Sequence, residues 1–459
     1  MKGLLKETIG WLKQKGVDYA DIRQVRKISE SIKVKNREVE AVSKNEDIGF
    51  GIRVLYKGAW GFASSNNVSK PEFKRVANQA LAIAKASAIA KKEDVRLADS
   101  EVYKDKYIGP CEIDPFSVSM DDKLNLMVSA CDLMLKNPAV KVADASLDFL
   151  KTEKIFVNSE GSEIEQTITE SGGGAVATAV KNGQTQSRSY PNSHSGDFAC
   201  RGYEFIRDMD MPRNMERISR EAAELLDAPD CPGQEATVII TGSQVALQIH
   251  ESCGHPIELD RVLGTEISLA GGSFMTLDKL GKLNYGSPKV NIFADATIPG
   301  GLGSFGYDDE GVKAQRFDIV KQGKFIGYLT SRETAPILKQ RSNGTMRADS
   351  WNRIPLIRMT NINLQPGEAT LDELIADTPN GFLLDTNRSW SIDDRRLNFQ
   401  FSVECAWEIK NGRVGQLHKN TIYSGITPEF WNSCDAVCNQ SYWRVWGVPN
   451  CGKGEPIQT

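Results

Sequence analysis

The segment at 228–233 most limits how this chain can fold. It reads Ala-Pro-Asp-Cys-Pro-Gly, and its two prolines and one glycine cannot continue a helix or a central strand. A chain of 459 residues is long enough to form more than one hydrophobic core. We therefore place a domain boundary at this break, which predicts domains at residues 1–228 and 234–459.

The residue patterns differ on the two sides of the break. Before it, apolar residues repeat at helical spacing over 5–12, where Gly16 follows as a helix stop, and again over 73–83. Alternating segments at 19–25 and 32–42 predict strands between these helices.

After the break, one strong helix stands among short strands and turns. We therefore expect an α+β protein of two domains. A mixed α/β N-terminal domain precedes a β-rich C-terminal domain, and the candidate metal site lies in the second.

Residues 32–58 and 155–183 share an order of features. Each segment has a strand, a Glu-hydrophobic-Glu triplet, a glycine-containing strand and a turn that ends in glycine. A repeated structural unit would explain the similarity. Independent hairpins with ordinary turn chemistry would explain it nearly as well.

Charge and cysteine usage exclude several classes of protein. The net charge of −4 lacks the basic excess of a general nucleic-acid binder. Nine scattered cysteines do not resemble a disulfide framework, and Lys6, Glu7 and Lys13 interrupt any signal-peptide core. No run of 18 apolar residues predicts a membrane span. These features predict a cytoplasmic protein without a direct nucleic-acid or membrane partner.

Two of the four histidines lie in one short motif, His250-Glu251-Ser252-Cys253-Gly254-His255. Five residues turn a regular helix by roughly 140° beyond one full turn, too far for both rings to meet one metal ion. Gly254 tolerates unusual dihedral angles, and Pro256 disfavours helix at His255. We expect the helix to widen into a π-like turn or to end near Gly254, which would bring the two rings together. The alternative is two satisfied, partly buried histidines at a helix end.

A catalytic zinc site usually has three protein ligands and one open position. The candidates for a third ligand are Glu258, Asp260, Cys253 or a distant residue. Cys253 fits better as a packed side chain of the helix itself, whereas Glu258 and Asp260 could be ligands or support them. Spacing alone does not choose among these residues.

Other motifs carry weaker signals. Residues 301–306 match G-x-G-x-x-G, but no helix signal follows, so we expect a loop that borders the active site. Cys434 and Cys438 are expected to be buried thiols, and His194 and His418 are expected to be exposed. The six tryptophans after residue 350 are expected to pack in the core.

The histidine motif and the segments downstream resemble the PmbA/TldD family, on its TldD-like metallopeptidase side. Residues 250–260 are similar to the family signature H-E-x-x-G-H-x-x-E-x-D. Segments 303–311, 358–361 and 451–453 are similar to its later motifs. The resemblance covers nearly the whole chain.

The resemblance implies a zinc ion held by His250, His255 and Cys451, with Glu251 as the general base for metal-activated water. It implies peptide hydrolysis by a homodimer or by a heterodimer with a PmbA-like subunit. Because dimerisation would enclose the site and admit only extended chain, we expect short or unfolded peptides as substrates. The alternative is a non-catalytic PmbA-like regulatory or binding subunit. The presence of all four residues named above argues against this alternative. The family is also known as a modulator of DNA gyrase, and we expect any such effect to act through proteolysis.

Overall fold

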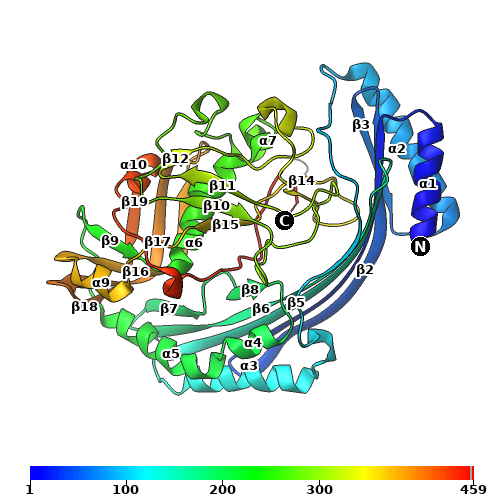
Figure 1. The fold of residues 1–459 in the computed structure, drawn as a ribbon. Coiled ribbons are helices and arrows are strands. Elements are labelled where there is room, and N and C mark those ends of the chain that lie inside the picture. The colour runs from blue at the N-terminus through cyan, green and yellow to red at the C-terminus, as the bar shows by residue number, and fades with distance from the viewer. Residues whose placement is uncertain (455–456, 459) are drawn as a thin grey trace.

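The computed structural model describes residues 1–454 and 457–458. Its N-terminal half is built on one eight-stranded sheet in the order β3-β2-β1-β5-β6-β4, and β7 and β8 also pair with β6. The strands are β1 (Tyr19–Lys35), β2 (Glu38–Tyr56), β3 (Ala59–Ser65), β4 (Lys104–Ile108), β5 (Val140–Asn158), β6 (Glu163–Lys181), β7 (Gln184–Tyr190) and β8 (Asp197–Ala199). The long strands curve together into a deep trough (Figure 1).

The segments with similar sequence features, 32–58 and 155–183, belong to two units that have the same order of strands. β1, β2 and β3 make consecutive antiparallel pairs, as do β5, β6 and β7, and the two units meet where β1 pairs with β5. The predicted strand at 32–42 is wrong in one respect, because the chain reverses within it. Asn36 and Arg37 both have positive φ, and Lys35 pairs with Glu38 across this two-residue turn.

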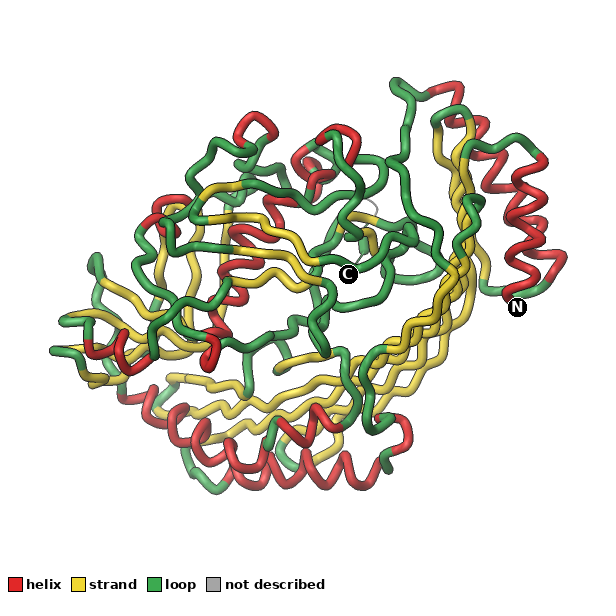
Figure 2. The backbone as a smooth tube through the Cα atoms, in the orientation of Figure 1, coloured by secondary structure: helices red, strands yellow, loops and turns green. Residues whose placement is uncertain are grey.

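Helices cover the convex side of the trough (Figure 2). They are α1 (Lys2–Gln14), α2 (Lys70–Ala90), α3 (Met120–Leu135), α4 (Glu204–Asp208) and α5 (Met211–Asp227). Apolar faces of α1 and α2 share one core with the sheet, and those of α3 and α5 share another. The concave side is thereby left for the second half of the chain.

The C-terminal half lies within the trough and contains three smaller sheets (Figure 1). Their strands are β9 (Thr237–Ile240), β10 (Ile292–Asp295), β11 (Arg316–Lys321), β12 (Lys324–Phe325), β13 (Met346–Arg347), β14 (Leu356–Ile357), β15 (Asn361–Leu364), β16 (Asn380–Ile392), β17 (Asn398–Lys410), β18 (Arg413–His418) and β19 (Ile422–Ile426). The helices are α6 (Gly242–Ile249), α7 (Leu259–Val262), α8 (Ile267–Ala270), α9 (Leu371–Ala376) and α10 (Thr427–Asn432). The expected α+β class is confirmed, whereas the division into two domains stays a prediction.

Buried ion pairs join the trough to the C-terminal half. Arg53 lies 3.3 Å from Glu310, and Arg188 lies 3.0 Å from Glu404. Both arginines are buried, and removal of one partner from such a pair costs about 3–5 kcal/mol. These contacts fix the position of the candidate site relative to the long sheet.

Several expectations about exposure are wrong. His418 is buried at the end of β18, where its ring meets Phe382 edge-on at 5.6 Å, because alternate residues of a strand face the core. Cys434 and Cys438 are only half-buried, and His194 is half-buried rather than exposed. Among the late tryptophans only Trp431 is buried.

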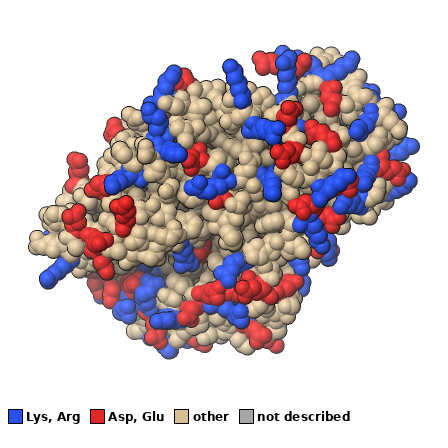
Figure 3. Space-filling model, in the orientation of Figure 1, with Lys and Arg blue, Asp and Glu red and all other residues tan. Residues whose placement is uncertain are grey.

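One face of the molecule carries charged side chains of both signs. On the face drawn in Figure 3, Lys and Arg are interspersed with Asp and Glu. None of the helices in the described part of the chain is long and apolar enough to cross a membrane.

Candidate metal centre

The histidine motif begins directly after α6, the helix that follows β9. The helix ends at Ile249, and the chain continues as a π turn over His250–Gly254 and a 3-10 turn over His255–Ile257. The π turn accommodates the fifth residue of the spacing, so the two imidazole rings lie 4.8 Å apart between centroids at 84°. The predicted widening of the helix is confirmed.

Gly254 has a different role from the one expected. Its φ of −58° and ψ of −56° are ordinary helical values, so no unusual dihedral angle requires glycine. A Cβ atom at this position would instead lie 2.1 Å from Sδ of Met359. The missing side chain lets Met359 pack directly against the histidine turn.

We therefore expect Gly254→Ala to destabilise the protein by about 1–3 kcal/mol through overpacking. Gly10→Ala in α1 is the matched control, because nothing lies within 4 Å of its added Cβ and alanine favours helix. Urea denaturation measures both variants. A Gly254→Ala protein as stable as the wild type would contradict the proposed close contact.

Cys451 is the third donor that the fold brings to the two histidines. Its Sγ lies 3.5 Å from Nε2 of His255, and one donor atom each from His250, His255 and Cys451 all lie within 4.8 Å of one another. Two imidazoles and one thiolate form a donor set that suits zinc and leaves a fourth position open.

The three candidate ligands that lie close to the histidines in the sequence have other surroundings in the structure. Cys253 is buried in the core of the C-terminal half. Glu258 accepts a hydrogen bond at 3.0 Å from Nδ1 of His255, on the opposite side of the ring from Cys451. Asp260 lies 2.8 Å from Nζ of Lys453. Glu258 thus orients a candidate ligand in the way that outer carboxylates orient metal-binding histidines.

Electrostatics favours the ligating form of the thiol. Burial acts to raise the pKa of Cys451, but His250 and His255 outweigh it and lower the pKa to about 5. Burial acts to lower the pKa of His255, but Cys451 and Glu258 raise it to about 9. Without metal, the pair is therefore thiolate and imidazolium, and a metal ion would replace the proton of His255.

Lys453 anchors the segment that carries Cys451. Its side chain is 0% exposed, and Nζ lies 3.2 Å from Glu258, 2.8 Å from Asp260 and 3.3 Å from Glu266. Arg261 shares two of these carboxylates, Glu258 and Glu266. The sequence contains no local signal for this cluster, because the tail reaches it only through tertiary folding.

Glu251 is buried beside the donor triad. Arg396 donates from Nη1 to its Oε2 at 2.6 Å. Burial acts to raise the pKa of Glu251, but His255, His250 and Arg396 outweigh burial and lower it. The side chain is thus an ionised carboxylate next to the candidate metal position. Sequence reasoning missed Arg396, which lies in the distant turn between β16 and β17.

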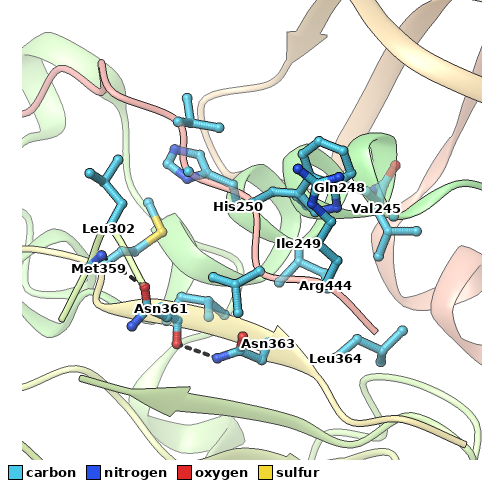
Figure 4. Close-up of a pocket in the computed structure, with 18 of the residues that line it drawn as sticks. Val245, Gln248, Ile249, His250, Leu302, Met359, Asn361, Asn363, Leu364 and Arg444 are labelled. Carbon is cyan, nitrogen blue, oxygen red and sulfur yellow. Dashed lines mark hydrogen bonds between the residues drawn. The ribbon is translucent and has the colours of Figure 1, made fainter. Parts of the chain in front are cut away.

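A cavity of about 1400 Å³ adjoins the triad and includes His250 and Cys451 in its wall. Figure 4 shows Asn361 and Asn363 of β15 facing the same space as His250. The loop at 302–305 also lines it, and β11 rather than a helix follows this loop. The glycine-rich motif therefore borders the cavity as expected.

Two short strands in the cavity wall pair with a neighbouring strand along one edge only, although the carbonyl of Leu364 in β15 also accepts a hydrogen bond from Trp443 at 3.2 Å. Within the described residues, β9 pairs only with β16, and β15 pairs only with β10. Both strands contribute all of their residues to the lining.

Family models match three segments that together cover most of the chain. Residues 20–84 match domain 1, residues 113–228 the central domain and residues 233–453 the C-terminal domain of PmbA/TldA metallopeptidases. The break at 228–233 falls between the second and third segments. The first two segments share the single long sheet.

Curated relatives match over nearly their full length. A metalloprotease of Methanocaldococcus jannaschii is 34% identical over 440 residues, covering 96% of this chain and 94% of that protein. A zinc metalloprotease TldD homolog of Saccharolobus solfataricus is 24% identical and covers 92% of this chain and 89% of its own.

Solved structures share the fold at low sequence identity. A protein of Thermotoga maritima named a modulator of a DNA gyrase superposes with a TM-score of 0.77 at 19% identity, covering 95% of this chain and 94% of its own. TldE of Thermococcus kodakarensis superposes with a TM-score of 0.72 at 18% identity, with the same coverage.

Proposed function

Because the chain belongs to the PmbA/TldD family of metallopeptidases, we propose that it is a zinc-dependent peptidase that hydrolyses short or unfolded peptides. The convergence of His250, His255 and Cys451 within 4.8 Å, beside the carboxylate of Glu251, carries this proposal. A bound zinc ion would lower the pKa of water and polarise the substrate carbonyl.

Glu251 supplies the proton transfers of the reaction. Its ionised carboxylate takes a proton from the attacking water as the new C–O bond forms at the substrate carbonyl. The same side chain then gives that proton to the amine when the C–N bond breaks. Arg396 favours the ionised form before attack, because its guanidinium donates a short hydrogen bond to Oε2.

The cavity supports extended peptides as substrates. Its volume of about 1400 Å³ exceeds the usual range of roughly 300–1,000 Å³ for small-ligand pockets. Strand addition at β9 or β15 would use backbone hydrogen bonds, which give little sequence preference. A folded protein could not present an extended segment there.

We also propose that the enzyme is cytoplasmic and acts as a homodimer or with a PmbA-like subunit. All nine cysteines are free, and Cys451 must stay reduced to bind metal. The non-catalytic alternative is disfavoured, because a purely regulatory subunit needs neither the donor triad nor Glu251.

Zinc content after substitution of Cys451 tests this assignment. We expect Cys451→Ala to weaken zinc binding at least tenfold and to abolish peptide cleavage, since only the two imidazoles remain. Cys111→Ala removes an exposed thiol elsewhere and should leave both properties unchanged. Competition with a colorimetric chelator and cleavage of an unfolded peptide mixture provide the measurements. Wild-type zinc affinity in Cys451→Ala would refute the ligand assignment.

A further inference from the structure

Two arginines in the cavity wall have no carboxylate partner. Arg347 of β13 and Arg358, directly after β14, both line the cavity. Both side chains are half-buried, and neither forms an ion pair with any described residue. Charged side chains are rarely withdrawn from water without a partner. Two of them together indicate a site that an anion completes.

The short β13–β14 pair places both arginines on one face. Arg347 lies opposite Leu356. The backbone N–H of Arg358 donates to the carbonyl of Thr345 at 2.8 Å, which extends the pairing beyond β14. Residues directly opposite one another, and residues two positions apart along a strand, share a face of the sheet. The two arginines are thus diagonal neighbours, close enough for long side chains to meet one ligand.

The two guanidinium groups are also close enough to affect each other. Burial lowers the pKa of Arg347, and the positive charge of Arg358 lowers it further. Glu170 and Asp309 act in the opposite direction, but Asp309 is already paired with two other cations. Glu170 forms no ion pair in the described part of the chain. An anion bound to both arginines would relieve their mutual repulsion.

Both guanidinium groups keep donors for a ligand. Nη2 of Arg347 donates to the carbonyl of Met359, and Nη2 of Arg358 donates to the carbonyl of Cys451. Nη1 of each arginine forms no hydrogen bond within residues 1–454 and 457–458, and both Nη1 atoms are accessible to solvent. A carboxylate has two oxygens, which match N–H donors from two guanidinium groups.

Arg358 links this pair of arginines to the candidate metal centre. The carbonyl that it holds belongs to Cys451, whose thiol is the third donor of the triad. An extended peptide advances about 3.3 Å per residue. A carboxylate bound beside the backbone of Cys451 is therefore one or two residues away from a peptide bond at the metal position. The free C-terminus of a peptide supplies such a carboxylate whatever its sequence.

We propose that Arg347 and Arg358 bind the free C-terminal carboxylate of the substrate, so that the enzyme removes one or two residues at a time from that end. This inference rests on the proposed peptidase function. The arginines select and position the substrate, while proton transfer stays with Glu251. The C-terminus is favoured over an acidic side chain, because every peptide carries it and the proposed function has little sequence preference.

Three matched peptides test the proposal. The first ends in glutamine with a free carboxylate, and the second has the same sequence with a C-terminal amide. The third is the amide with its last residue changed from glutamine to glutamate, so it offers only a side-chain carboxylate. Their cleavage is measured as kcat/KM, and their binding is measured by calorimetry in proteins that also carry Glu251→Gln.

Three variants accompany the wild type. Arg347→Met is the main one, because Arg347 bonds to the carbonyl of Met359 and leaves Cys451 untouched. Arg358→Gln removes the charge but keeps an amide donor for the carbonyl of Cys451. Arg444→Met is the matched control, since Arg444 also lines the cavity (Figure 4) but pairs with Asp197 at 2.9 Å. Metal analysis establishes that all four proteins contain equal zinc.

In the wild type, kcat/KM for the free acid should exceed that for the amide by roughly 10–100-fold, the factor that hydrogen bonds to a charged group contribute. Arg347→Met and Arg358→Gln should lose this preference, and Arg444→Met should keep it. Calorimetry should give the same ratios in Kd. Mass spectrometry of the products should show peptides shortened from the C-terminus.

Different failures would have different meanings. If the wild type cleaves none of the peptides, the peptidase function is wrong, and the ratios of Kd still decide the role of the arginines. Equal affinity for the acid and the amide would overturn the inference. So would an unchanged preference in folded Arg347→Met and Arg358→Gln. Full affinity for the amide that ends in glutamate would assign the site to acidic side chains instead.

Discussion

Replacement of Glu251 by Gln should abolish peptide cleavage while zinc stays bound. The amide is nearly isosteric with the carboxylate, so the turn at His250–Gly254 and the donor triad should keep their geometry. An amide cannot accept the proton of the attacking water, and general-base catalysis contributes about 10²–10⁴-fold to rate. We expect kcat to fall by at least that factor. Single-turnover cleavage and metal analysis of the same preparation measure both properties.

Glu170→Gln provides the matched control for this experiment. Glu170 is another carboxylate in the wall of the cavity, but it contacts no member of the triad. Its substitution should leave kcat within a few-fold of the wild type. Near-normal cleavage by Glu251→Gln would remove Glu251 from the proposed mechanism, whatever the zinc content.

Replacement of Lys453 by Met should cost both stability and zinc affinity. The side chain neutralises Glu258, Asp260 and Glu266 at a site without solvent access. Removal of one partner from a buried ion cluster costs about 3–5 kcal/mol. Because Lys453 also ties down the tail, Cys451 should lose its position, and zinc should bind roughly 10–100-fold more weakly, as after loss of outer-shell support.

Urea denaturation and chelator competition separate these two effects. Lys410→Met is a suitable control, since Lys410 forms an exposed ion pair with Glu408 and such pairs contribute little. It should change the free energy of unfolding by less than about 1 kcal/mol. Unaltered zinc affinity in a folded Lys453→Met protein would show that Cys451 is held in place by other contacts.

The sequence predicted those parts of the site that depend on local chemistry. The spacing of His250 and His255, together with Pro256, was enough to predict the widened turn. The role predicted for Gly254 was wrong, because glycine is needed there to make room for Met359. Met359 lies between β14 and β15 and reaches the histidine turn only through tertiary folding. Cys451 was reached through resemblance alone, since nothing near it in the sequence marks a ligand.

The residues that were missed lie on separate elements. Lys453 comes from the tail and Arg396 from a hairpin turn. No periodicity links them to the histidine motif, and only the tertiary folding of the C-terminal half brings them near the histidine turn. The hairpin reversal at Asn36 and Arg37 was missed for a simpler reason. It has no glycine, so the usual signal of a tight turn is absent.

The late position of Cys451 has a consequence for biosynthesis. A ribosome that has passed codon 255 but not codon 451 carries a nascent chain with both imidazoles and no third donor. Such a chain cannot assemble the triad, so under the proposed function it would not cleave its own unfolded segments or those of neighbouring polysomes. In the proposed function, peptide cleavage would therefore require that the segment with Cys451 has been made and that Lys453 has docked into its acidic cluster.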